Sequence, residues 1–563
     1  MEGAAGGSAG AATRRWDPYL LGILLLSAAL DLWHLRWGLP NGNHSWAADA
    51  VGPVTALGVA RRTFATWNSG WFYFKYPPAW PFIMVLASLP YLALLHLTGG
   101  WRHPTAEYPY GFADPERALF VLSMIGRLVS VAFGVGLTAL AYGIGARLFD
   151  RATARWSAFL TATSYPLVFY AHTTNLDISY CFWLILALYA ALRASGAGLP
   201  PRHTWPWAAA LGFAAAMALS TKEQGFAWLL PLPFLVWGLR VRADGWRVLL
   251  GPITWAMLGS GLLTLLIANN AIINPMGFVG RIAYLLGHPI GDVQARLAPV
   301  EFALWKGTKE WVYVDHVRTG MDSSLGLPLL ALAGCGLLLL WRRPLAAAWL
   351  LTPVVLQYYL SLRGLELITV RYLLPITVVG GILVALTLAW LRAAARAPWA
   401  RAAAIVVVSA VGMLSLARAV EIDAVLTRDA RYAAEAWMAT HLPRGASAEV
   451  YQKPAFVPRF LGGLKGRFVP MEERTLAGVA ARNPDAIVTS SASHKSITHV
   501  WTADWRETRS LLAPHPAAVE FLDALENGKL PYRLAAVFSQ EPRILHNRIT
   551  SVAPEIRIYV RRE

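Results

Sequence analysis

Two aspartates stand in short polar stretches between long apolar runs, where a carboxylate could take part in acid–base chemistry. Asp49 follows the first apolar run by about ten residues, and Asp177 ends the short stretch 172–177 between two later runs. A carboxylate beside a membrane can act as a general base toward a hydroxyl group. Either residue could instead be an ordinary surface acid or a helix cap. We therefore take Asp49 and Asp177 as the candidate catalytic residues.

A divalent metal ion is a further possibility at the same place. Asp49, Asp177 and His172 could together supply two carboxylates and an imidazole, which are common metal ligands. Their spacing matches no strong metal-binding signature, so a metal cofactor stays an open alternative. The tail has neither a phosphate-binding glycine loop nor a zinc motif.

Three cations lie where a phosphate could be bound. Lys75 stands alone among aromatic residues, Arg371 begins a late apolar run, and Arg127 lies inside another. Lysine and arginine both bind phosphates. Lys75 could instead anchor the chain in an aromatic belt, and Arg127 could pair with Asp114 or Glu116.

Other polar residues of the same loops could contact an acceptor. Lys222 and Glu223 are adjacent, so they could also form a self-contained ion pair in a turn. The candidates for acceptor contacts are His44, His172, Asn175, Lys222 and Arg281.

The composition places these residues in a membrane protein. Of 563 residues, 56% are hydrophobic and 15% charged, and the mean hydropathy is +0.43. This composition excludes a disordered chain or an ordinary soluble enzyme. The formal net charge of +17 fits the excess of arginine in cytoplasmic loops better than it fits binding to nucleic acid. The two cysteines lie in apolar runs, which disfavours a disulfide framework.

A transmembrane helix needs about 20 apolar residues, and twelve runs are candidates. They are 19–39, 79–98, 119–147, 155–172, 178–194, 205–221, 226–239, 248–272, 324–341, 345–360, 372–391 and 401–420. Several short connections between the runs carry arginines, which places them in the cytoplasm. All of them lie on that side only if the proline-rich run 79–98 does not cross the membrane and is re-entrant or interfacial. We therefore predict an all-α bundle of about eleven spans, with the N-terminus in the cytoplasm.

This topology places two long loops and the C-terminal tail on the outer side. The predicted organisation is a disordered N-terminus (1–18), a transmembrane domain (19–420) with outer loops 40–118 and 273–323, and a soluble domain (421–563). Short apolar runs near 484–489, 534–538 and 556–560 predict strands, and 429–441 and 515–527 predict helices. The tail is therefore expected to be a small α/β domain outside the membrane.

The order of several motifs resembles a known family. The chain has an outer aspartate, then "KYPPAWPF", "IGRLVSVAFGVGLTALAYGIGARLF", "YPLVFYAHTTNLDISY", "ALSTKEQG" and "RYLLPI". It resembles the GT-C glycosyltransferases, in particular bacterial relatives of the dolichyl-phosphate-mannose protein mannosyltransferases and the aminoarabinose lipid A transferases. The resemblance runs from about residue 19 to 420, and the tail resembles a periplasmic domain of many bacterial members.

The resemblance implies a membrane enzyme that transfers a sugar from a polyprenyl-phosphate donor on the outer face of the membrane. We hypothesise a single displacement by an acceptor hydroxyl, with inversion. The resemblance implies Asp49 as the base, a second-loop aspartate at Asp177, and Lys75 on the lipid phosphate, with Arg371 as a further donor-binding residue. Many members have Asp-Glu where this chain has Asp49-Ala50, which leaves the acceptor class open. The expected partners are the donor, a glycan, lipid or protein acceptor, and membrane lipids, without nucleic acid.

The expected location is the bacterial inner membrane, with the tail in the periplasm. Two other functions stay open: a ligase or polymerase that joins whole polyprenyl-linked glycans, and a transporter of lipid-linked sugars. A transporter would place its charged residues at mid-depth on broken helices, whereas the polar residues here gather at one edge of the predicted membrane.

Overall fold

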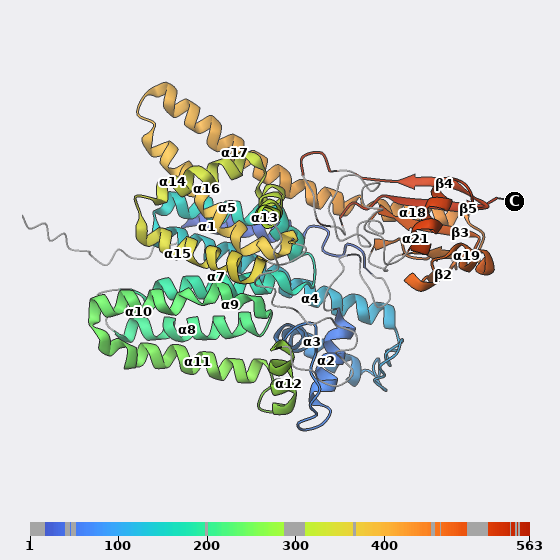
Figure 1. Ribbon diagram of the computed structural model, residues 1–563, viewed down its shortest axis with the longest axis horizontal. Helices are drawn as coiled ribbons and strands as arrows, with labels where there is room; N and C mark the ends of the chain where they lie inside the picture. The colour runs from blue at the N-terminus through green and yellow to red at the C-terminus, as the bar shows by residue number, and fades with distance from the viewer. Residues whose placement is uncertain are drawn as a thin grey trace, which may run out of the picture.

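The computed structural model of the chain describes most of its length. The described residues are 17–39, 46, 52–196, 201–286, 310–363, 368–451, 456–461, 463–491, 516–540, 542–545, 549 and 552–562. The membrane half is a helical bundle with a continuous apolar core, and a small domain with a β-sheet lies beyond one end of it (Figure 1). The predicted architecture, an all-α membrane bundle followed by an α/β domain, is confirmed.

Seventeen α-helices precede the C-terminal domain in the described residues. They are α1 (Pro18–Leu32), α2 (Pro53–Phe64), α3 (Ala79–Leu97), α4 (Pro115–Leu148), α5 (Arg151–Ala162), α6 (Tyr165–Ala171), α7 (Leu176–Ala194), α8 (Pro201–Leu219), α9 (Phe226–Leu229), α10 (Pro231–Asp244), α11 (Pro252–Ala268), α12 (Pro275–Leu285), α13 (Glu310–Leu325), α14 (Leu327–Leu340), α15 (Pro344–Gln357), α16 (Leu374–Ala394) and α17 (Pro398–Thr427). Many begin with proline in the first turn, where its missing N–H costs nothing.

Eight of the described helical segments are long and apolar enough to cross a membrane, or nine if the bent pair α13–α14 counts as one. Shorter apolar helices, Pro18–Leu32 and Thr204–Leu219, come in addition. The run 79–98, expected to be re-entrant or interfacial, forms the single helix α3 and is also long and apolar enough to cross a membrane. The number of spans therefore stays a prediction.

Two predicted spans differ in detail from the structure. The first helix ends at Leu32, and the following residues to Gly38 form turns. The run 155–172 is divided between α5 and α6 at Thr163 and Ser164, where Ser164 has an extended backbone and a proline opens α6. No charged residue interrupts the chain from Trp156 to Ala171, which is why the sequence pattern merged the two helices.

The C-terminal domain has one five-stranded mixed sheet. Its strands are β1 (Ser447–Val450), β2 (Lys465–Phe468), β3 (Ala486–Ser490), β4 (Tyr532–Phe538) and β5 (Ile556–Arg561), in the order β2-β1-β3-β5-β4. The pairs β1–β2 and β1–β3 are parallel, whereas β5 is antiparallel to β3 and β4. Its helices are α18 (Ala430–His441), α19 (Leu476–Arg482) and α21 (Pro516–Glu526). The three predicted strands and two predicted helices are confirmed.

Helix α17 connects the two halves of the molecule (Figure 1). It continues past residue 420 and ends at Thr427, immediately before α18. Asp429 caps α18 and accepts a hydrogen bond from the Trp37 indole at 3.0 Å, while the Tyr432 hydroxyl accepts one from the Gly38 amide at 3.0 Å. The C-terminal domain is therefore fixed to the segment that follows α1.

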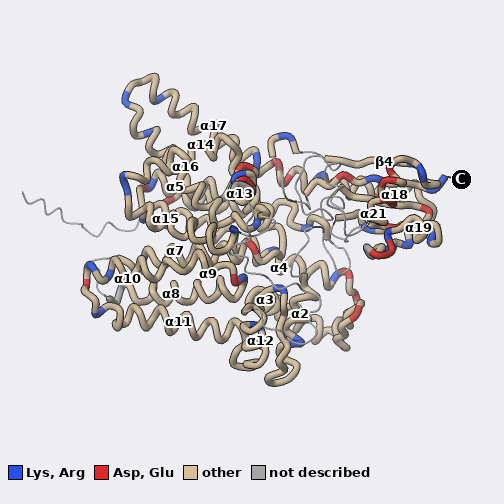
Figure 2. The backbone as a smooth tube through the Cα atoms, viewed as in Figure 1, with Lys and Arg blue, Asp and Glu red and all other residues tan. Residues whose placement is uncertain are grey.

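Charge is distributed unevenly along the bundle. Figure 2 shows Lys and Arg at the end of the bundle remote from the C-terminal domain, at the connections α10–α11 and α16–α17. At the opposite end, α2, α3 and α12 lie together, nearer to the C-terminal domain (Figure 1). Both signs of charge are mixed there and in the C-terminal domain (Figure 2).

Candidate functional site

A buried ion pair joins two turns that are far apart in the sequence. Asp177 lies in the first turn of α7, and Lys222 lies in the turn after α8. Lys222 Nζ is 2.9 Å from Asp177 Oδ1, and both side chains are buried. Lys222 therefore does not form a self-contained pair with Glu223, and that alternative is wrong: in the described residues, Glu223 pairs with Arg281.

Arg371 joins this pair through an aromatic side chain. Lys222 Nζ lies 4.3 Å from the centre of the Tyr372 ring, and the guanidinium carbon of Arg371 lies 5.1 Å from the same ring. Arg371 also donates a hydrogen bond of 3.4 Å to the Tyr372 hydroxyl. Its Nε is buried and has no hydrogen-bond partner among the described residues. Cations on an aromatic face are stabilised by the ring quadrupole.

Tyr76 completes this group on the side of α3. Burial raises the pKa of Tyr76 to about 12, while the nearby Arg371 acts to lower it and Asp177 acts to raise it. The phenol therefore stays protonated and can donate a hydrogen bond at neutral pH. We call Tyr76, Asp177, Lys222, Arg371 and Tyr372 the cation cluster.

The cation cluster carries more positive than negative charge. It contains two cations, Lys222 and Arg371, and one carboxylate, Asp177, which pairs with Lys222. An arginine with an unused donor and a lysine beside it can bind an anion such as a phosphate. The ion pair with Lys222 gives Asp177 a role in orienting that cation.

Lys75, another predicted phosphate ligand, is exposed. It follows segment 70–73, which is held by hydrogen bonds to Asn274 and Arg281. The Asn274 side chain donates to the Trp71 carbonyl at 2.7 Å and accepts from the Gly70 amide at 2.9 Å. Arg281 donates to the Tyr73 carbonyl. Because Tyr76 belongs to the cation cluster, Lys75 lies one residue from it in the chain.

Arg281 links that segment to the turn after α8. Its guanidinium bonds both the Tyr73 carbonyl and Glu223, which is the neighbour of Lys222. It is buried and lies on α12. Of the predicted acceptor contacts, Arg281 thus lies beside the cation cluster and joins the segment that leads to Tyr76 to the turn that contains Lys222.

His172 is buried and its two ring nitrogens both face carbonyl oxygens. Nδ1 lies 2.7 Å from the Val168 oxygen and Nε2 lies 2.5 Å from the Trp33 oxygen. Asp423 on α17 lies 3.6 Å from the same Nε2. In this arrangement both nitrogens of His172 are in close contact with protein oxygens, and Asp177 is engaged by Lys222.

No group of three potential metal ligands occurs among the described residues. Asp49, the third predicted metal ligand, and His44 lie outside the described residues. The metal site and the base role of Asp49 therefore stay predictions.

The turn between α6 and α7 is packed tightly. The Trp80 indole on α3 donates to the Thr174 carbonyl at 2.8 Å, and the Asn175 amide donates to the Thr173 hydroxyl at 3.2 Å. Asn175 is the N-cap residue of α7 and is buried. This predicted acceptor contact thus lies in a turn that positions Asp177.

Arg127 has a different setting from the other cations. It is fully buried on α4, and its Nη1 donates to the carbonyls of Leu35 and Trp37 at 2.6 and 2.7 Å. These carbonyls belong to the turns after α1, so the guanidinium fixes that part of the backbone. Asp114, offered above as a possible partner of Arg127, caps α4 by accepting from the Arg117 amide at 3.0 Å.

The two tyrosines of the cation cluster were not singled out by sequence reasoning. Tyr76 and Tyr372 each follow a predicted phosphate ligand, Lys75 and Arg371, in the chain. A tyrosine directly after a lone cation at the edge of an apolar run was the signal that could have identified them. Tyrosines at such positions are equally expected as anchors in the aromatic belt at the membrane surface, so the pattern did not single them out.

Comparisons with known proteins agree with the sequence motifs over part of the chain. Residues 121–272 match the family model of dolichyl-phosphate-mannose-protein mannosyltransferases. This segment includes Asp177 and Lys222. No curated protein matches the chain.

Solved structures show only a distant likeness. The oligosaccharyltransferase of Archaeoglobus fulgidus, in a complex with zinc and sulfate, has a TM-score of 0.48 and 14% identity over 89% of this chain and 70% of its own. ArnT from Cupriavidus metallidurans, bound to undecaprenyl phosphate, has a TM-score of 0.45 and 13% identity over 87% of this chain and 97% of its own. The family-model match confirms the resemblance drawn from the motifs: the segment 121–272 is similar to the dolichyl-phosphate-mannose-protein mannosyltransferases.

Proposed function

We propose that this chain is a membrane glycosyltransferase that moves one sugar from a polyprenyl-phosphate donor to a hydroxyl group of an acceptor. The observation that carries the proposal is the cation cluster, in which Lys222 and Arg371 converge on Tyr372 beside a single carboxylate. The family-model match over residues 121–272 supports the reaction class.

The reaction needs one leaving group and one base. The acceptor oxygen attacks the anomeric carbon, and the bond from that carbon to the phosphate oxygen breaks. The electron pair of the broken bond stays on the polyprenyl phosphate, and the acceptor proton passes to a carboxylate. Attack from the face opposite the phosphate inverts the anomeric configuration.

The cations serve the leaving group. Lys222 and Arg371, with Lys75 from the neighbouring segment, would stabilise the negative charge that develops on the phosphate as the bond breaks. Asp177 would hold Lys222 in place through their ion pair. Asp49 is proposed as the base, on the strength of its place in the sequence and the family resemblance.

The proposed location is the bacterial inner membrane, with the reaction on the outer face. The concentration of Lys and Arg at the end of the bundle remote from the C-terminal domain (Figure 2) favours a cytoplasmic position for that end. The cation cluster and the C-terminal domain would then face the periplasm.

The proposal is tested with purified protein in lipid nanodiscs and a panel of radiolabelled polyprenyl-phosphate sugars. Wild type is compared with Arg371→Gln, Asp49→Asn and Arg392→Gln. Arg392 is the matched control, because it is an exposed arginine in the last turn of α16, whereas Arg371 precedes the start of the same helix.

We expect one donor to release labelled sugar, to an acceptor or to water, with Arg371→Gln slowed about a hundredfold and Arg392→Gln unchanged. Near-normal transfer by Asp49→Asn would remove Asp49 from the base role. If no donor is turned over and the protein binds only larger lipid-linked glycans, the reaction is not monosaccharide transfer.

A further inference from the structure

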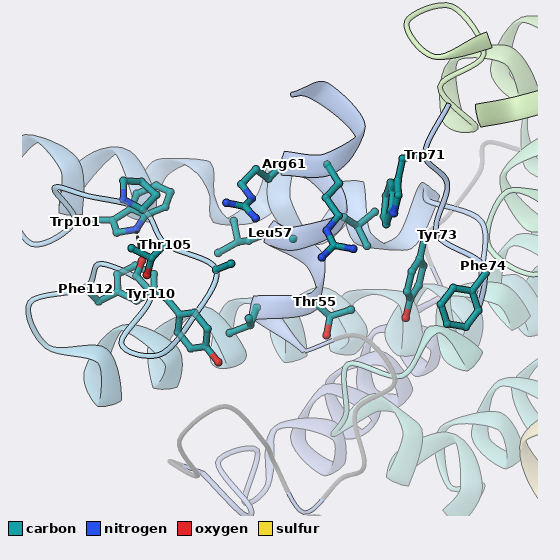
Figure 3. Close-up of a pocket in the computed structure, with 16 residues that line it drawn as sticks. Thr55, Leu57, Arg61, Trp71, Tyr73, Phe74, Trp101, Thr105, Tyr110 and Phe112 are labelled. Atoms are coloured by element: carbon teal, nitrogen blue, oxygen red, sulfur yellow. Dashed lines mark hydrogen bonds between the residues drawn. The ribbon is translucent and has the colours of Figure 1, made fainter. Parts of the chain in front are cut away.

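A cavity lies beside helix α2, and no member of the cation cluster lines it. It has a volume of about 480 Å³ and extends along α2 between segment 71–74 and loop 101–112 (Figure 3). Six aromatic side chains line it: Trp71, Tyr73, Phe74, Trp101, Tyr110 and Phe112. We call this cavity the α2 pocket.

The α2 pocket is positively charged. Arg61 and Arg62, from the last turn of α2, line it and are exposed. The Arg62 guanidinium carbon lies 5.6 Å from the centre of the Trp71 ring. Figure 3 shows Arg61 between the aromatic residues of the two walls. None of the described residues that line the pocket is acidic.

Both walls are fixed by ring contacts and hydrogen bonds. On one side, the rings of Trp101 and Phe112 stack with centres 5.6 Å apart, and the Trp101 indole donates to the Tyr110 carbonyl at 3.1 Å. On the other side, Asn274 and Arg281 hold segment 70–73 as described above. A preformed pocket loses little free energy to ordering when a ligand binds.

The α2 pocket adjoins the cation cluster through Tyr73 and Arg281. Tyr73 lines the pocket, and its carbonyl accepts a hydrogen bond from Arg281. The Arg281 guanidinium also bonds Glu223, the neighbour of Lys222 in the chain. A ligand in the α2 pocket would therefore lie next to the place where the proposed leaving group departs.

The lining indicates the chemistry of the ligand. Flat aromatic faces pack against the apolar C–H faces of sugar rings, and a pair of arginines binds a phosphate or a carboxylate with directed hydrogen bonds. A neutral sugar would leave both guanidinium groups unused. A lipid chain would need no cations.

We propose that the α2 pocket binds the acceptor, and that the acceptor is a saccharide carrying a phosphate or carboxylate group. Its ring lies against the aromatic wall, and its anionic group is bound by Arg61 and Arg62. This inference rests on the proposed function and adds to it the chemical class of the acceptor.

The test separates acceptor binding from donor chemistry. Wild type, the double variant Arg61→Gln/Arg62→Gln and the control Arg102→Gln are compared in nanodiscs. Arg102 is an exposed arginine next to Trp101 that does not line the pocket. Three radiolabelled probes are used: a disaccharide, its 6-phosphate and the corresponding uronic acid. Equilibrium binding is measured without donor, and then KM for transfer and the rate of donor hydrolysis in water.

We expect the double variant to weaken binding of the anionic probes at least tenfold and to raise their KM to a similar extent. Binding of the neutral probe and donor hydrolysis should stay at wild-type values, as should every measurement on Arg102→Gln. Unchanged binding of the anionic probes, or equal weakening for the neutral one, would overturn the proposal.

Two further outcomes would also overturn it. A slower donor hydrolysis in the double variant would mean that the pocket holds the donor. An effect seen only in nanodiscs of anionic lipid, and absent in phosphatidylcholine, would mean that the arginines bind a membrane headgroup. Failure of the proposed function itself is recognised separately, because wild type would then hydrolyse no donor while the binding measurement still decides the occupant of the pocket.

Discussion

Buried charges occur both in the cation cluster and where the C-terminal domain meets the membrane half, but they are balanced differently. At the contact with the C-terminal domain, Arg431 pairs with Asp429 at 2.5 Å and Arg459 pairs with Glu435 at 2.7 Å. Each of these arginines makes more than one hydrogen bond to its carboxylate. The cation cluster has two cations, Lys222 and Arg371, and one acid, Asp177, which pairs with Lys222.

The comparison teaches that burial alone does not mark a binding site. Arg431 is as deeply buried as any residue in the molecule and packs 4.5 Å from the centre of the buried Trp46 ring, yet its charge is already neutralised. Arg371 keeps a donor without a partner among the described residues. A surplus of charge and of unused donors distinguishes the two regions.

The largest expected effect is on stability, at the balanced contact. Arg431→Met removes one partner of a fully buried pair and leaves Asp429 uncompensated, which costs about 3–5 kcal/mol. Thermal unfolding and limited proteolysis in nanodiscs should show an earlier transition that begins in the C-terminal domain. Arg428→Gln, an exposed neighbour, is the control and should unfold like wild type. Equal stability of the two variants would contradict the structural role of the pair.

The next effect is on catalysis, in the cation cluster. Arg371→Gln should slow transfer about a hundredfold, as the loss of one preorganised charge does in other enzymes. Its unfolding temperature should fall less than that of Arg431→Met, because no carboxylate is left without its partner. If Arg371→Gln mainly lost stability and Arg431→Met mainly lost activity, the roles assigned to the two regions would be wrong.

Asp177 should have a smaller effect, because it acts through Lys222. We expect Asp177→Asn to lower transfer about tenfold, chiefly by raising KM for the donor, since the lysine loses the partner that orients it. In a double-mutant cycle with Lys222→Gln, the two losses should not add. Additive losses in kcat would show instead that Asp177 acts on the reacting atoms.

The smallest effect concerns pH in the C-terminal domain. The Ser447 amide and hydroxyl donate to Asp485, with Arg561 beside it, and they hold the pKa of that carboxyl below its ordinary value of 3.8. The resulting stability is present above the unfolded pKa and is lost as pH falls through the lowered folded value.

Thermal unfolding from pH 6 down to pH 2 checks this prediction. Asp485→Asn should lower the unfolding temperature slightly at pH 6 and remove part of the decrease seen in wild type below about pH 4. Identical pH profiles of the two proteins would show that this carboxyl contributes nothing to stability.

Much of this architecture could be predicted from the sequence because its signals are local. Apolar runs predicted most helices of the bundle, and short apolar segments predicted the strands β3, β4 and β5. Helices α2, α12 and α13 were not predicted, because they lie in segments assigned to the outer loops. Strands β1 and β2 were not predicted, since each has only four residues and β2 is exposed throughout. Such short strands exist through pairing with a neighbour, which a local pattern does not contain.

The candidate site was predicted only as a list of residue types. Lys222 and Asp177 were both named, but their pairing was not, because 45 residues separate them while Glu223 stands next to the lysine. Arg127 was grouped with the predicted phosphate ligands, whereas in the structure it donates hydrogen bonds to backbone carbonyls. Which partner a charged side chain takes depends on how the helices pack, and a single sequence does not specify that packing.

Helix α17 places the C-terminal domain and the turn before Asp177 on one support. It is unbroken over 30 residues, so it spans about 45 Å. Asp423, near one end, lies beside His172, in the turn that leads to Asp177, and α18 follows the same end. The last turns of α17 therefore contact this turn and also carry the start of the C-terminal domain, so the positions of the two are set by the same few residues.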